Sequence, residues 1–147
     1  KFCSVKQLLI SYFVYEELFA LNKSDITSVK SLINAGAIMV VKTAAPSTAY
    51  KIKLTTADAS IVQAYFEHKA QALLTDDAAI CSYCRKNSIP YFNTPIALYI
   101  LVKNKLLSFN NFQAALHDVY CLGRFSHGVK DYMKKLTSDL SAGSHSD

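Results

Sequence analysis

The chain has 147 residues, of which 51% are hydrophobic and 18% are charged, and its formal net charge is +5. This composition excludes a disordered chain and predicts one globular domain over residues 1–140, followed by a flexible tail over 141–147. No apolar run reaches the ~20 residues that a membrane-spanning helix needs, and no secretory signal is visible. We therefore expect a cytoplasmic protein with reduced cysteines, and the positive charge mildly favours an anionic partner such as nucleic acid.

Strand-like and helix-like segments alternate along the chain. In chain order, the expected elements are a strand at 7–11, helices at 12–22 and 24–34, a strand at 37–41, a helix at 56–69, a strand at 72–74, a helix at 77–87, a strand at 89–92, and helices at 95–105, 110–122 and 126–140. Ser11 is expected to cap the first helix, and Gly36 to take the left-handed conformation that ends the second. Pro95 suits the first turn of its helix.

This alternation predicts an α/β fold in which a parallel sheet is sandwiched between helices on both faces. Strands covered on both faces do not alternate in hydrophobicity, so the apolar segments 37–41 and 73–74 are expected to be buried and to pair in one sheet. On the last helices, near-helical spacing leads us to expect four side chains facing the core or a dimer partner, namely Phe112, Leu116, Val119 and Leu122.

Acidic residues stand where parallel α/β sheets bind ligands. Asp58 closes a Thr-x-x-Asp pattern, which taken alone predicts a helix capping box. Asp76 and Asp77 follow a predicted strand, and either can cap the next helix. Glu16 and Glu17 lie early in the first helix, where acids also stabilise the helix dipole. Because strand ends and helix starts share one edge of the sheet, these acids would repel each other unless a hard cation such as Mg²⁺ or Mn²⁺ neutralised them.

The order of these segments resembles a PIN domain, the fold of metal-dependent ribonucleases that includes the VapC-type toxins. SYFVYEELF is similar to the family's second strand and the following helix, which gives Glu17 as a metal-site residue and Glu16 as the runner-up. TTADASIVQAYFEHKA is similar to the helix that begins with the third family acid, Asp58, and LLTDD to the strand followed by Thr-x-Asp, which gives Asp77 with Asp76 beside it. RKNSIPYFNTPIALYILVKNKLLS is similar to the family's helix, "IP" strand and following helix.

The resemblance implies a Mg²⁺- or Mn²⁺-dependent endoribonuclease, the toxin of a toxin–antitoxin pair, or a fragment of one. It implies Glu17, Asp58 and Asp77 as catalytic metal ligands, with Asp76 as a further metal residue. The implied partners are RNA, an antitoxin protein and a second copy in a homodimer. PIN domains open with a strand that ends in an Asp, and no such Asp precedes Gln7, so we expect the chain to be incomplete at its N-terminus. The alternative is a non-catalytic PIN-like module that binds RNA or protein.

Other patterns have structural interpretations beside the functional ones. Cys81-Ser-Tyr-Cys84 is a CxxC one turn into a predicted helix, which favours packing over a redox or zinc site. Arg124 follows a glycine at a helix break and either contacts a phosphate or lies in solvent. The aromatic residues are interpreted as core, and the histidines have no nucleophile partner. A Rossmann-like nucleotide binder ranks last because no G-x-G-x-x-G loop is present.

Overall fold

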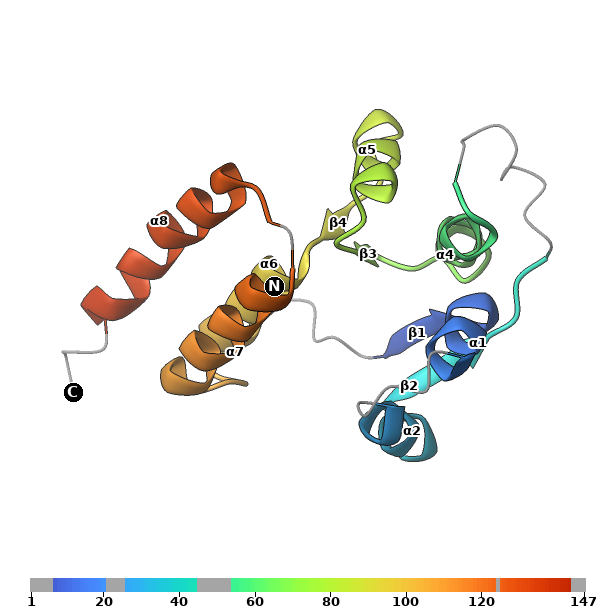
Figure 1. Ribbon diagram of the computed structural model, residues 1–147, viewed down its shortest axis with the longest axis horizontal. Helices are drawn as coiled ribbons and strands as arrows, with labels where there is room; N and C mark the ends of the chain where they lie inside the picture. Colours follow the sequence, from blue (N-terminus) through green and yellow to red (C-terminus); the bar gives the residue numbers. More distant parts are fainter. Residues whose placement is uncertain (1–6, 21–25, 45–53, 124, 144–147) are drawn as a thin grey trace. The chain divides into compact units, whose positions relative to one another are not determined.

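The computed structural model describes residues 7–20, 26–44, 54–123 and 125–143, with side chains as far as Ser138 (Figure 1). The chain forms two compact units. The first comprises Lys1–Leu73 and Asp77–Pro90, and the second comprises Leu74–Asp76 and Tyr91–Asp147. No helix in these ranges is long and apolar enough to cross a membrane.

The first unit is built on a parallel pair of strands. Its described elements are β1 (Leu8–Ser11), α1 (Tyr12–Ala20), α2 (Ile26–Asn34), β2 (Ile38–Val41), α4 (Thr56–Glu67) and α5 (Ala78–Lys86). β1 and β2 run in parallel, in a register that places Leu8 opposite Ile38 and Ser11 opposite Val41. α1 packs on both strands and on α4, α2 packs on β2, and α4 packs on β1. The pair of strands is therefore held by helices drawn from three different parts of the sequence.

Gly36 follows the end of helix α2 and takes the left-handed conformation expected from the sequence. Gly36 has a φ of +73°, in the left-handed region where a residue with a Cβ would be strained. Its N–H donates to the Ile33 carbonyl, and the N–H of Ala37 donates to the Leu32 carbonyl, both at 2.9 Å. These two bonds close the last turn of the helix and direct the chain into β2.

Small side chains on α4 form much of the core of the first unit. The buried positions of this helix are Ala57, Ala59, Ser60, Val62 and Ala64. Such short side chains allow α4 to approach β1 and α1 closely. Ile80 and Cys84 are the buried residues of α5.

The second unit consists mainly of helices. Its elements are β4 (Tyr91–Phe92), α6 (Thr94–Lys103), α7 (Phe109–Leu122) and α8 (His127–Gly143). The two-residue β3 (Leu73–Leu74) pairs with β4 through bonds from the Leu73 N–H to the Pro90 carbonyl and from the Thr75 N–H to the Phe92 carbonyl, both at 2.9 Å. From the first bond to the second, the donor moves forward by two residues, from Leu73 to Thr75. The acceptor also moves forward by two, from Pro90 to Phe92, as in a parallel pair. α6, which has Pro95 in its first turn as expected, packs against α7 and α8.

The α/β class with parallel strands is as expected, but the single sheet is not. Within the described residues, β1 with β2 and β3 with β4 form two separate two-stranded sheets. A two-residue strand has few free N–H and C=O groups, and the bonds of β3 go to the β4 segment. Burial is also uneven, because Val41 and Leu73 are buried while Met39 is 41% exposed and Leu74 is 48% exposed. The expectation of fully buried strands in one sheet was therefore wrong.

The last two helices also differ from the sequence pattern. Phe112 is 1% exposed, whereas Leu122 is 89% exposed, so Leu122 does not face the core. Leu122 lies ten residues after Phe112. At 3.6 residues per turn, the helix rotates about 80° less than three full turns over this distance, so the Leu122 side chain points away from the face that buries Phe112. α8 continues to Gly143 instead of stopping at Leu140, because Ser141 and Ala142 do not break a helix. Residues 144–147 of the expected tail, and Arg124, lie outside the described residues.

Candidate active site

A buried hydrogen bond between two serines joins the last residue of β1, directly before α1, to α4. Ser11 and Ser60 are 4% and 0% exposed, and their Oγ atoms are 2.7 Å apart. Ser60 donates its hydroxyl proton to the Ala57 carbonyl at 2.6 Å, so the proton between the two serines comes from Ser11. Ser11 Oγ also accepts the Val14 N–H at 3.3 Å, which is the cap expected for α1. One hydroxyl therefore starts α1 and links it to α4.

Glu16 and Glu17 are neighbours on α1 but differ in their surroundings. Both are exposed. The Glu16 carboxylate accepts a hydrogen bond from the Tyr12 phenol, and this bond, followed by the negative charge of Glu16, raises the pKa of Tyr12. Glu16 is thus engaged within its own helix, and the ranking of Glu17 above Glu16 stays a prediction.

Asp58 occupies the first turn of α4, in the capping arrangement that its Thr-x-x-Asp pattern predicts. Thr55 Oγ1 accepts the Asp58 N–H at 3.1 Å, and the same hydroxyl donates to Asp58 Oδ2 at 2.7 Å. The carboxylate is half-buried at the start of the helix, where the free N–H groups stabilise negative charge. Thr55 is therefore the cap of α4, and the Asp58 carboxylate accepts the hydroxyl proton of that cap.

Asp76 and Asp77 are adjacent in sequence but serve different elements. Asp77 caps α5, because its Oδ1 accepts the N–H groups of Ala79 and Ile80, both at 2.8 Å. Asp76 holds the start of α6 with both carboxylate oxygens: Oδ1 accepts the Thr94 N–H at 2.8 Å, and Oδ2 accepts the Thr94 hydroxyl. Asp77 belongs to the first unit and Asp76 to the second.

The candidate acids have the right chemistry for a hard cation, but they are not gathered into one group. Glu17, Asp58 and Asp77 all belong to the first unit and offer carboxylate oxygens, the ligands that Mg²⁺ and Mn²⁺ prefer. Among the residues that the structure describes, no three His, Cys, Asp or Glu side chains lie close enough to hold a metal ion together. The described side chains therefore do not form a three-ligand metal site. Asp77 accepts free N–H groups at the start of α5, and Asp58 accepts the hydroxyl of Thr55, the cap of α4.

The CxxC of α5 is a packed pair. Cys84 is fully buried, and burial, with the charge of Cys81 as a smaller cause, raises the pKa of its thiol. Redox-active cysteines have a lowered pKa, because the thiolate is the reactive form. The environment of Cys84 thus agrees with the packing interpretation.

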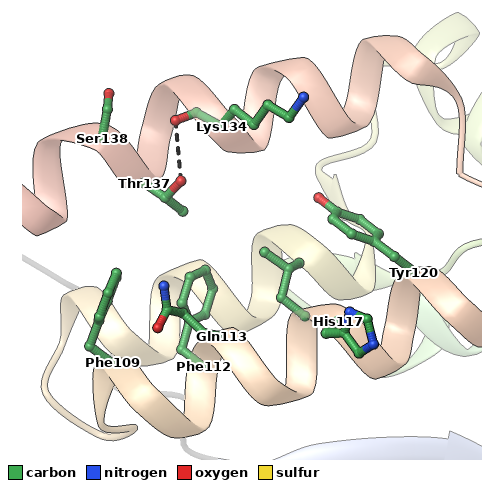
Figure 2. Close-up of a pocket in the computed structure, with 9 residues that line it drawn as sticks. Phe109, Phe112, Gln113, His117, Tyr120, Lys134, Thr137 and Ser138 are labelled. Atoms are coloured by element: carbon green, nitrogen blue, oxygen red, sulfur yellow. Dashed lines mark hydrogen bonds between the residues drawn. The ribbon is translucent and has the colours of Figure 1, made fainter.

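A groove lies between α7 and α8 in the second unit, with a volume of about 480 Å³ (Figure 2). It is lined by Phe109, Phe112, Gln113, Leu116, His117, Tyr120, Lys134, Thr137 and Ser138. Figure 2 shows Tyr120 reaching from α7 toward α8, and burial raises the pKa of its phenol. None of the candidate acids lines this groove.

Two residues that make hydrogen bonds to distant parts of the chain were missed from the sequence. Ser60 lies among alanines inside a helix, and a serine on a buried helical face is a signal for a buried hydrogen bond. Thr94 stands directly before Pro95, at a helix start where hydroxyl and carboxylate groups often pair. Neither position carries a motif that names its distant partner.

Comparison with known families adds one finding. A family model described as a PIN domain matches residues 4–125, which is well over half of the chain. No curated protein and no solved structure matches the sequence.

Proposed function

The chain belongs to the PIN-domain family, and on this premise we propose that it is a metal-dependent endoribonuclease, the toxin of a toxin–antitoxin pair. The proposed ligands of Mg²⁺ or Mn²⁺ are Glu17, Asp58 and Asp77, with Asp76 as a neighbouring acid. The proposed partners are RNA, an antitoxin protein and a second copy of the chain. A positive net charge of +5 agrees with a polyanionic substrate.

The observation that best supports this proposal is the Ser11–Ser60 hydrogen bond. It joins the start of α1, which carries Glu17, to the first turns of α4, which carry Asp58. Two acids far apart in the sequence are thereby held on helices that pack directly against each other. Buried polar bonds of this kind restrict how two helices can shift, and this suits a site that must hold carboxylates in place.

The residues around the acids would orient them. Thr55 holds one oxygen of Asp58, and the N–H groups of Ala79 and Ile80 hold one oxygen of Asp77. Each carboxylate is thus kept at a helix start, beside the positive end of the helix dipole. If these carboxylates held a divalent ion, it would supply the activation of water toward a phosphodiester and the neutralisation of developing charge.

Cleavage of a labelled single-stranded RNA in Mn²⁺ or Mg²⁺, with EDTA as the blank, tests the proposal. Glu17→Gln, Asp58→Asn and Asp77→Asn should each reduce cleavage by at least tenfold. Asp131→Asn is the matched control, because Asp131 is an exposed acid of α8 that pairs only loosely with Lys134 at 3.8 Å. RNA binding without metal-dependent cleavage would instead identify a non-catalytic PIN-like module.

A further inference from the structure

The outward face of α7 carries two side chains that can ligate transition metals. Cys121 is about 2.5 helical turns beyond the buried Phe112, so it projects from the opposite side of the helix. His117, one turn before Cys121, is also exposed and lies at the edge of this face, where it also lines the groove toward α8. Figure 2 shows the ring of His117 beside its own helix and not reaching across to α8 as Tyr120 does. The nuclease proposal uses neither residue.

The two ligand atoms are already at the separation that a shared metal ion requires. Cys121 Sγ and His117 Nε2 are 3.6 Å apart. With Zn–S near 2.3 Å and Zn–N near 2.0–2.1 Å, a tetrahedral zinc ion holds its sulfur and nitrogen ligands about 3.5–3.6 Å apart. The pair could therefore bind zinc with little rearrangement. A weak S–H···N hydrogen bond also suits this distance and is the competing interpretation.

Two ligands fill only half of a tetrahedron, and the remaining half must come from elsewhere. We propose that His117 and Cys121 form half of a zinc site, and that a second copy of the chain supplies the same two ligands across a two-fold axis. The result is a Cys₂His₂ site. Each thiol loses its proton to solvent on binding, and the two thiolates balance the double charge of Zn²⁺.

The surroundings of the pair fit a second copy of α7. The exposed residues of this face recur at i, i+3, i+4, i+7 and i+8, the spacing of one helical stripe: Ala114, His117, Asp118, Cys121 and Leu122. Leu122, which is 89% exposed, provides apolar surface that a second helix would cover. Ala114, at the other end of the stripe, has a side chain small enough for close approach.

Titration of the reduced, metal-free full chain with Co²⁺ tests this site. Cobalt adopts the tetrahedral geometry of zinc, and a thiolate ligand gives it a near-ultraviolet charge-transfer band. We expect saturation at one Co²⁺ per two chains, displacement by Zn²⁺ but not by excess Mg²⁺, and a metal-bound mass twice the 16.3 kDa of one chain.

Matched variants separate this site from the other thiols and imidazoles. Cys121→Ser and His117→Asn should each abolish the charge-transfer band at one ion per two chains, and both positions are exposed, so the fold should persist by circular dichroism. Cys81→Ser and His127→Asn should keep the band. A missing band in the wild type, a band that survives in Cys121→Ser, or saturation at one ion per chain would overturn the proposal. RNA cleavage is not part of this readout, so a failure of the nuclease proposal leaves the result unaffected.

Discussion

The hydroxyl of Ser11 donates to Ser60 Oγ across 2.7 Å in the buried part of the first unit, 49 residues away in the sequence. Ser60→Ala should leave the Ser11 hydroxyl buried without its acceptor and lower the free energy of unfolding by about 1–3 kcal/mol. Chemical denaturation measures the change. Ser31→Ala is the control, because Ser31 is exposed and its hydroxyl donates to the Thr27 carbonyl one turn earlier.

A double-mutant cycle resolves how much of this effect belongs to the pair. Ser11→Ala should lower the free energy of unfolding by about 1 kcal/mol more than loss of the serine–serine bond alone would, because Ser11 also caps α1. The double variant should be less destabilised than the sum of the two single variants, since both partners of one bond are then gone. Additive effects would mean that the two serines are not energetically coupled.

Asp77 can be tested as a cap and as a proposed ligand with two substitutions. Asp77→Ala should lower the free energy of unfolding by about 0.5–2 kcal/mol, because Ala cannot accept the N–H groups of Ala79 and Ile80. Asp77→Asn should be nearly neutral, since an amide oxygen also accepts at an N-cap. If Asp77 is also a metal ligand, both variants should lose metal-dependent cleavage although only one loses stability.

Thermal melts with and without Mn²⁺ test metal binding independently of activity. A ligand that binds only the folded state at about 100 times its Kd stabilises that state by about 2.7 kcal/mol, which raises the Tm by several degrees. Asp58→Asn should weaken this rise while keeping the start of α4, and Glu16→Gln should leave it intact. An equal rise in wild type and in Asp58→Asn would remove Asp58 from the proposed ligands.

The core of the second unit supplies a contrast within one helix. Phe112→Ala should lower the free energy of unfolding by about 3–5 kcal/mol, because Phe112 is 1% exposed. Leu122→Ala, at an 89% exposed position of the same helix, should change it by less than about 0.5 kcal/mol in the monomer. Equilibrium denaturation at low protein concentration measures both. Equal effects would contradict the assignment of the buried face of α7.

Stability should fall at alkaline pH in part because of Cys84. Its thiol pKa is raised in the folded state by burial, so the folded chain keeps a proton that the unfolded chain releases. This contribution is fully present below the unfolded thiol pKa of about 8.5 and is lost as pH rises through the higher folded value. Cys84→Ala should therefore flatten the decline of unfolding free energy above about pH 8.5, as measured by chemical denaturation across that range.

The sequence by itself determined the features that depend on close neighbours in the chain. The cap formed by Thr55 and Asp58, the cap at Asp77 and the turn at Gly36 each involve atoms no more than five residues apart. Their geometry follows from local backbone sterics and from the free N–H groups of a helix start, which any chain with these residues would satisfy in the same way. The PIN-like order of helices and strands could be predicted for the same reason, because hydrophobic periodicity depends on residues that are close together in the sequence.

Only the tertiary structure decided which distant groups meet. The bond from Ser11 to Ser60 and the bond from Thr94 to Asp76 span 49 and 18 residues, and no local pattern names either partner. The separation of the strands into two pairs was likewise missed, and only the structure showed that Leu122 does not face the core, because strand pairing and burial depend on what packs against a face. Whether separate carboxylates converge is a question of the same kind, since their distances are set by the packing of whole helices and not by the residues beside them.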